Sequence, residues 1–291
     1  MIGIYDYSFI LGRYLKTVED IAGVYCSSDE LSAMHDIGLE KICTDNEIYI
    51  DEMIHRAFNK IAEKPDIIFI AHSLPFITAN GHNIMPYVND IPVMRLSGLP
   101  CVILHRAVMT AVKMVQAGIY KTVLVIGADK AYSDRERIFF GTIMGDSAIA
   151  LLIKNGCEHN QILASHIATH IIAPYGENSS DEGIRKFRAV NVQMMRQAMQ
   201  ECLLKAKLEA VDYYVTHTSN CKFWDAVSAL CKIPREKFLD GNIKNTGHLN
   251  SNDSFVHYFH WCAHDIIKDG ETAMLINPGF GGSQGCTLIR R

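Results

Sequence analysis

Several features that would assign this chain to a common class of protein are missing from its sequence. Lysine and arginine number 28 against 32 aspartates and glutamates, and the net charge of −4 argues against a nucleic-acid binder, which usually carries a basic face. No run of purely apolar residues is long enough to cross a bilayer. The 9 cysteines are odd in number and never stand in CxxC spacing, which excludes a disulfide framework and a CxxC zinc site. These absences predict a cytoplasmic protein that binds neither nucleic acid nor membranes.

The composition is that of a globular protein, and the hydrophobic pattern alternates between segments typical of strands and segments typical of helices. The 291 residues are 48% hydrophobic and 21% charged, enough for two domains or one large α/β unit. The start of the chain is apolar in places without a basic region, so we interpret it as a first strand and not as a signal peptide. Apolar runs predict further strands at residues 66–71, 122–126, 149–153, 213–215, 274–276 and 287–289. Helical periodicity predicts helices at residues 50–62, 102–117, 192–208, 222–230 and 254–268. Polar composition predicts loops at residues 155–160 and 174–186.

The two sides of the polar break at residues 155–160 show the same order of elements. On each side a strand leads to a histidine, His72 in the first half and His217 in the second, then to a glycine-terminated helix and another strand. Strands that alternate with helices imply a sheet with helices on both faces. We therefore predict an α/β fold of two similar halves, residues 1–155 and 156–291, with the chemistry where the halves meet.

Cys101 is the first candidate for that chemistry, because the predicted helix at residues 102–117 follows it directly. A thiol at the first turn of a helix lies at the positive end of the helix dipole, which favours the nucleophilic thiolate. A buried free cysteine is also common as a structural residue, so Cys101 alone leaves both interpretations open.

Three further segments carry residues that thioester chemistry needs. Residues 216–220 (THTSN) follow a buried strand, residues 245–250 (NTGHLN) precede a helix, and residues 279–285 (GFGGSQG) lie between the last two strands. Each has a structural explanation of its own, as a satisfied histidine, a helix cap or a tight turn. Taken with Cys101, they supply a nucleophile, imidazoles and a glycine backbone that can approach an oxyanion.

In their order and spacing these segments resemble the thiolase superfamily, specifically the β-ketoacyl-acyl-carrier-protein synthase III-like enzymes. Residues 101–129 resemble the family's nucleophile helix, whose cysteine also lies seventeen residues before the closing glycine. Residues 139–153 resemble its phenylalanine-glycine-aspartate-glycine segment, residues 216–220 its proline-histidine-glutamine-alanine-asparagine motif, and residues 279–282 its C-terminal glycine turn. The resemblance implies a thiolase-like fold with a layered αβαβα arrangement.

The resemblance also implies the catalytic residues. Cys101 corresponds to the nucleophile and His217 to the catalytic histidine of the family. Synthase III enzymes carry an asparagine as their third group, and counting from His217 and back from Gly270 places His248 at that position. A second histidine is typical of the elongating synthases and thiolases, so we favour His248 and keep Asn245, three residues earlier, as the alternative.

Other residues are implied to bind the substrate. The family's oxyanion hole corresponds to the N–H groups of Cys101 and Gly282. The remaining substrate contacts that the resemblance implies are Asn220, Lys222, Phe280 and Gly281. The tryptophan and arginine that hold coenzyme A in family members are not found, which favours an acyl-carrier-protein thioester as the donor and leaves an acyl-coenzyme A as the alternative. Pro100 and Val102 replace the small residues usual beside the cysteine, which predicts an unusual acyl pocket.

The implied activity is that of an acyltransferase of the 3-oxoacyl-acyl-carrier-protein synthase III type. Cys101 would accept an acyl group, which would then condense with a decarboxylating malonyl-type thioester in fatty-acid-like or polyketide-type metabolism. The resemblance implies a homodimer and no cofactor apart from the thioester substrate. Two alternatives stay open: acyl transfer to an oxygen or nitrogen acceptor without decarboxylation, and a silent partner subunit of a heteromeric synthase.

A metal site is the last possibility that the sequence raises. His257, His260 and His264 share one face of a predicted helix, with Asp253 a turn earlier. Because the sequence has no HExxH pattern, we predict a polar helix face there and no metal.

Overall fold

The computed structural model describes residues 1–73, 90–139, 141–170, 172–173, 179–218 and 220–291. The strands in these ranges are β1 (Gly3–Leu11), β2 (Tyr14–Thr17), β3 (Lys41–Thr44), β4 (Ile67–Ala71), β5 (Val93–Leu96), β6 (Thr122–Asp129), β7 (Ile138–Phe139), β8 (Thr142–Ile143), β9 (Ser147–Lys154), β10 (Gln161–Thr169), β11 (Tyr213–Thr216), β12 (Phe238–Leu239), β13 (Thr272–Gly279) and β14 (Ser283–Arg290). The helices are α1 (Val18–Ala22), α2 (Ser28–Asp36), α3 (Ile50–Phe58), α4 (Ile103–Gln116), α5 (Asp134–Arg137), α6 (Asp181–Ala206), α7 (Cys221–Cys231), α8 (Ile243–Thr246) and α9 (Asp253–Ala263).

A ten-stranded mixed sheet with an internal symmetry organises the molecule. Its strand order is β12-β11-β13-β14-β10-β1-β9-β6-β4-β5. β1 and β10 meet in the middle through one pair of residues, Gly3 and Gln161. Outward from this seam, both groups of five strands have the same succession, two antiparallel pairings followed by two parallel ones. This symmetry confirms the two similar halves. The division of the chain at residue 155, which falls between β9 and β10, stays a prediction.

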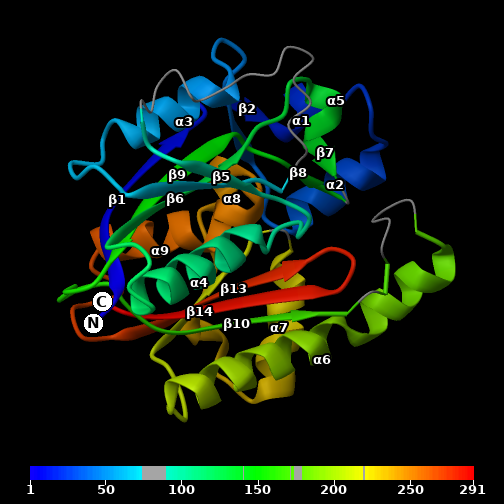
Figure 1. Cartoon of the computed structure of the whole chain (residues 1–291). Helices are drawn as coiled ribbons and strands as arrows, with labels where there is room; N and C mark the ends of the chain where they lie inside the picture. Colours follow the sequence, from blue (N-terminus) through cyan, green and yellow to red (C-terminus); the bar gives the residue numbers. More distant parts are fainter. Residues whose placement is uncertain (74–89, 140, 171, 174–178, 219) are drawn as a thin grey trace.

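The helices complete five layers (Figure 1). α4 and α9 lie between the two halves of the sheet, and their apolar residues share one cluster with both. α3 covers the outer face of the first half, and α6 and α7 cover the outer face of the second. The αβαβα arrangement implied by the resemblance is therefore confirmed.

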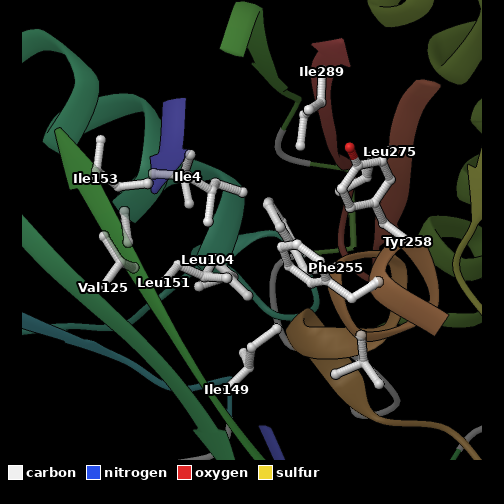
Figure 2. Packing of buried hydrophobic residues seen from close by; sticks show 14 of the residues in the cluster. Ile4, Leu104, Val125, Ile149, Leu151, Ile153, Phe255, Tyr258, Leu275 and Ile289 are labelled. Carbon is white, nitrogen blue, oxygen red and sulfur yellow. The ribbon is translucent and has the colours of Figure 1, made fainter. Parts of the chain in front are cut away.

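The central strands are apolar on both sides because both of their faces are covered. In β9, Ile149, Leu151 and Ile153 pack against the central helix layer, whereas Ala148, Ala150 and Leu152 pack against α3. Successive side chains of a strand point to opposite faces, so a strand covered on both sides is a continuous apolar run. Figure 2 shows the central layer, where Leu104 of α4 lies between residues of β9 and Phe255 of α9.

The strands predicted from apolar runs are all present, whereas β10 and several short elements, among them β2, β3, β5, α1 and α2, were not predicted. Residues 174–186 were predicted as a loop, but α6 begins at Asp181, where the Ser180 hydroxyl accepts a hydrogen bond from the N–H of Gly183 at 3.2 Å. This serine cap, followed by two acidic residues, is an N-terminal helix signal within a polar segment. α3 and α9 end earlier than predicted, at Phe58 and Ala263. β10 was not predicted, because its side chains are only partly buried and give no clear pattern.

Within the described ranges, no helix combines the length and the apolar character that a membrane span requires.

Candidate active site

Cys101 lies at the start of α4 in a backbone conformation that is unusual for a residue with a side chain. Its φ is +61°, in the left-handed region, and α4 begins two residues later at Ile103. The prediction of a thiol inside the first helical turn is therefore corrected to a thiol just before it. The carbonyl of Cys101 accepts a hydrogen bond from Asn277 Nδ2 at 2.8 Å, and its N–H donates to Ser73 Oγ at 3.3 Å. Such strained residues cluster at functional sites, where surrounding bonds hold them in place.

Two histidines from the other half of the chain face this cysteine. His217 follows β11, and its carbonyl accepts a hydrogen bond from the indole N–H of Trp224 at 2.8 Å. His248 follows α8, and its backbone N–H donates to the carbonyl of Ile143 at 2.9 Å. The Nε2 atom of His248 lies 3.8 Å from Cys101 Sγ, and the two imidazole rings are 4.4 Å apart. The structure therefore brings together the three residues that the sequence nominated, in a buried position between the halves.

A buried carboxylate beneath the histidines was not predicted as part of this site. The Oδ2 atom of Asp253, the first residue of α9, is 2.6 Å from His248 Nδ1 and 3.6 Å from His217 Nε2. Its Oδ1 atom accepts hydrogen bonds from Thr218 Oγ1 at 2.6 Å and from the N–H of Leu249 at 2.8 Å. The sequence drew attention to Asp253 only as a neighbour of a histidine face, because the five-residue spacing from His248 has no signature of its own.

The surroundings raise the pKa of His248 and lower the pKa of His217. Burial alone would lower the pKa of His248, but the Asp253 carboxylate and the contact with Cys101 raise it to about 10. Burial and the neighbouring His248 lower the pKa of His217 to about 3, although Asp253 opposes them. Burial would raise the pKa of Asp253, yet the surrounding histidines hold it well below its ordinary value. At neutral pH the site therefore contains an ionised carboxylate, a protonated His248 and a neutral His217.

A mostly apolar cavity of about 450 Å³ opens over these groups. It lies between α2, α6 and the turn that joins β13 to β14, with Phe280 of that turn in edge-to-face contact with Phe187 of α6. The described residues that line it are Ala33, Ile37, Cys101, Phe139, Gly141, Thr142, Phe187, Arg188, Asn191, His217, Asn220, Phe223, His248, Pro278, Gly279 and Phe280. Arg188 is the one permanent cation in this lining, which contains no carboxylate. Arg188 was missed because no element was predicted between residues 186 and 192, whereas α6 runs through this stretch.

Of the substrate contacts implied by the sequence, Asn220 and Phe280 line the cavity, and the other two do not. Lys222 pairs with Asp36 at 3.3 Å on the surface, and Gly281 lies in the turn but outside the lining, where its carbonyl accepts a hydrogen bond from the N–H of Ile172 at 3.1 Å. Gly282 is also outside the lining, and its N–H donates to the carbonyl of Gly279 at 3.3 Å. The structure therefore does not direct the Gly282 N–H into the cavity.

The alternative third group, Asn245, is likewise absent from the cavity lining. Its side chain lies on the exposed side of α8, where Nδ2 donates to Asn242 Oδ1 at 2.9 Å. Between the two alternatives, only His248 reaches Cys101.

The described residues contain one group of side chains close enough for a metal ion, and it is not the predicted histidine face. His257, His260 and His264 do not form such a group, since His257 is buried toward Asp253 while the rings of His260 and His264 contact each other at a tilt, 4.2 Å apart. The ligand atoms of Cys101, His217 and His248 lie within 4.8 Å of one another. A cysteine nucleophile and the imidazoles that assist it must lie equally close together, so we assign the three residues to nucleophilic chemistry and not to metal binding.

A buried cysteine with two imidazoles, placed between the halves of a doubled α/β fold under an apolar cavity, defines a class of α/β proteins built around a cysteine nucleophile. Family comparison agrees with this assignment. The family model 3-Oxoacyl-[acyl-carrier-protein (ACP)] synthase III matches residues 100–170, and the model of its C-terminal part matches residues 204–291. Together they cover more than half of the chain, which belongs to the thiolase superfamily as a 3-oxoacyl-acyl-carrier-protein synthase III-like protein.

Individual relatives are distant. A β-ketoacyl-acyl-carrier-protein synthase III of Lactococcus lactis subsp. lactis is 27% identical over 202 residues, which cover 60% of this chain and 61% of that protein. The chain thus matches less than two thirds of the length of the curated relatives. The crystal structure of a 3-oxoacyl-acyl-carrier-protein synthase III from Aquifex aeolicus superposes with a TM-score of 0.82 and 20% identity over 100% of both chains. A priming β-ketosynthase of the R1128 polyketide pathway superposes with a TM-score of 0.82 and 16% identity over 99% of this chain and 96% of that one. These likenesses establish the thiolase-like fold.

Proposed function

We propose that the protein is a 3-oxoacyl synthase III-like acyltransferase that forms an acyl-cysteine and extends it by decarboxylative condensation. The observation that carries the proposal is the placement of Cys101, His217 and His248 together at the base of one apolar cavity. The apolar lining suits an acyl chain. Arg188, exposed on α6, suits the phosphate that coenzyme A and the prosthetic arm of a carrier protein share.

The first half-reaction is acyl transfer onto Cys101. The Cys101 sulfur attacks the thioester carbonyl, and the bond to the departing thiolate breaks as this leaving group takes the proton held by His248. The N–H of Cys101 is one donor to the oxyanion once it leaves its long 3.3 Å bond to Ser73 Oγ. We place the second donor in the part of the turn that lines the cavity, Gly279 and Phe280, in preference to Gly282.

The second half-reaction forms the carbon–carbon bond. A malonyl-type thioester loses carbon dioxide, and the electron pair of the broken bond forms an enolate whose oxygen is stabilised by the N–H groups of His217 and of His248 once His248 is protonated again. The enolate carbon attacks the acyl group, and the bond to Cys101 sulfur breaks to restore the thiolate. Each turnover thus consumes one proton, which leaves with the first thiol. Neither half-reaction requires a metal or a redox cofactor. The donor carrier, the cytoplasmic location and the homodimer stay predictions.

Intact mass spectrometry tests the proposal directly. The pure protein is incubated with acyl-coenzyme A and acyl-carrier-protein thioesters of several chain lengths, and then with a malonyl thioester. We expect a stable acyl adduct on the wild type, no adduct on Cys101→Ala, and loss of the adduct with release of carbon dioxide when malonyl donor is added. An adduct that persists in Cys101→Ala, or no adduct with any donor, would contradict the proposal. An adduct transferred to water or an amine without carbon dioxide release would limit the activity to acyl transfer.

A further inference from the structure

The carboxylate of Asp253 is held more firmly than any neighbour in the site. It is completely buried and accepts four hydrogen bonds, two on each oxygen. Oδ1 receives the Thr218 hydroxyl and the N–H of Leu249, whereas Oδ2 receives the N–H of Thr218 at 3.1 Å and His248 Nδ1. Because the first three donors fix both oxygens, the orientation of the carboxylate toward His248 does not depend on His248 itself.

This geometry dictates which nitrogen of His248 carries a proton. An ionised carboxylate only accepts hydrogen bonds, so Nδ1, 2.6 Å from Oδ2, must be the protonated nitrogen. In the neutral ring, Nε2 then holds the lone pair, and Nε2 is the atom that faces Cys101 Sγ at 3.8 Å. The opposite tautomer, which would leave Nε2 protonated and unable to accept the thiol proton, is excluded by the position of Asp253.

We propose that Asp253 is a positioning residue that holds His248 in the tautomer able to take the Cys101 thiol proton, so that the resting site contains a thiolate–imidazolium pair. The proton moves from Sγ to Nε2, and the negative charge on sulfur is balanced by the new positive charge on the ring. The inference rests on the proposed function, because it explains how the same cysteine becomes a nucleophile. It also explains the source of the proton that the departing thiol takes.

The other titratable groups around Cys101 and His248 are consistent with a positioning role for Asp253. The Nε2 atom of His217 also lies 3.6 Å from Oδ2, but burial and the neighbouring His248 lower the pKa of His217, which favours its neutral form. His257 approaches the other oxygen of Asp253 at 3.6 Å from the same helix, α9. No arginine or lysine lies in the hydrogen-bond network of Asp253 within the described ranges, so the histidines provide its counter-charge. The titratable groups that face the pair from the surrounding elements are His105, His217, Asp253 and His257.

A purely structural role is the competing explanation, since two of the four bonds of Asp253 hold backbone N–H groups of the adjoining loops and a third holds the Thr218 hydroxyl. Alkylation of Cys101 by iodoacetamide distinguishes a positioning role of Asp253 from a purely structural one. The alkylation rate depends on the fraction of Cys101 present as thiolate, and the reaction needs no thioester substrate. The rate at Cys101 is followed by peptide mass spectrometry from pH 5 to 10, which distinguishes this residue from the other cysteines.

We expect Cys101 of the wild type to be alkylated faster at pH 6.5 than an ordinary thiol, and its rate to depend less on pH. In Asp253→Asn the rate at pH 6.5 should fall by roughly ten- to a hundredfold, since an ordinary thiol with a pKa near 8.5 is about 1% ionised there. His248→Ala should show the same loss, and the double variant should be no slower than either single variant. Thr218→Val is the matched control: it removes one bond to the same carboxylate but not the bond to His248. It should lower the melting temperature and leave the pH profile unchanged.

An unchanged profile in folded Asp253→Asn, additive losses in the double variant, or an equal shift in Thr218→Val would each overturn the proposal. If Asp253→Asn does not fold, NMR titration of ¹⁵N-histidine in the wild type, assigned with His248→Gln, still tests it. A cationic His248 at pH 7 supports the proposal, and a neutral one overturns it. Failure of acyl-adduct formation would contradict the proposed function without altering these alkylation rates, so the two failures are distinguishable.

Discussion

The two tryptophans of the chain provide a matched pair for measuring what one hydrogen bond contributes beneath the site. Trp224 of α7 is 1% exposed, and its indole N–H donates to the carbonyl of His217 at 2.8 Å. Trp261 of α9 is partly buried, and its indole nitrogen has no hydrogen-bond partner within the described part of the chain. Trp224→Phe therefore removes an existing hydrogen bond, whereas Trp261→Phe removes an N–H donor that has no hydrogen-bond partner within the described part of the chain.

The expected losses of folding stability in the two variants follow from this difference in hydrogen bonding. Trp224→Phe loses a partner for a buried carbonyl, which costs about 1–3 kcal/mol, and leaves a gap that costs roughly 1–2 kcal/mol more. Trp261→Phe leaves a comparable gap, which lowers stability, but it also removes the desolvation penalty of the unpaired N–H, which raises stability. The two effects oppose each other. We expect Trp224→Phe to be the less stable variant by about 2 kcal/mol. At roughly 2–4 °C per kcal/mol for a chain of this size class, its melting temperature should be lower by about 5 °C.

Thermal unfolding by circular dichroism measures this difference, and each variant keeps one tryptophan whose fluorescence reports on the same transition. Trp224→Phe should also acylate more slowly, because the carbonyl it contacts fixes the backbone of His217. If Trp261→Phe were as unstable as Trp224→Phe, or less stable, the reasoning from hydrogen-bond satisfaction would be refuted. If both variants were as stable as the wild type, the packing argument would fail as well.

Three further predictions follow from the packing and charge of the site. In Gly127→Ala the new Cβ would lie 2.1 Å from the buried Oδ1 of Asn252, so chemical denaturation should show a loss of about 2–3 kcal/mol that Asn252→Ala partly restores. Asn245→Ala should keep the self-acylation rate within about twofold whereas His248→Ala should lose it, measured by adduct formation at pH 7; equal losses would return the third role to Asn245. The raised pKa of His248 contributes stability that is complete below its ordinary value of 6.5 and is lost as the pH rises toward about 10. The lowered pKa of His217 costs stability as the pH falls from 6.5 toward about 3. Denaturation midpoints should therefore fall on the acidic side of pH 6.5 and again as the pH approaches about 10, and His248→Gln should flatten the alkaline side. A wild-type stability that still rises between pH 7 and 9 would contradict this assignment.

Local patterns in the sequence determined most of the fold, and together with the family resemblance they nominated the three central residues of the site. Strands covered on both faces are continuous apolar runs, and helices with one buried face show helical periodicity, so both can be recognised without knowing the partners. Cys101 was nominated from its place before a predicted helix, whereas His217 and His248 were nominated with it only through the resemblance of their segments to family motifs, with Asn245 left as an alternative to His248.

Only the tertiary structure decided how these groups are oriented and what supports them. Asn245 and His248 are three residues apart in the sequence, but α8 directs the first to solvent and the turn after it directs the second to Cys101. The Gly282 N–H is turned away from the cavity because the tight turn uses it internally. Asp253 joins the site because the start of α9 packs beneath the loop after β11, which brings its carboxylate to Thr218, 35 residues away in the chain. Such contacts depend on side-chain direction and long-range packing, which residue spacing does not encode.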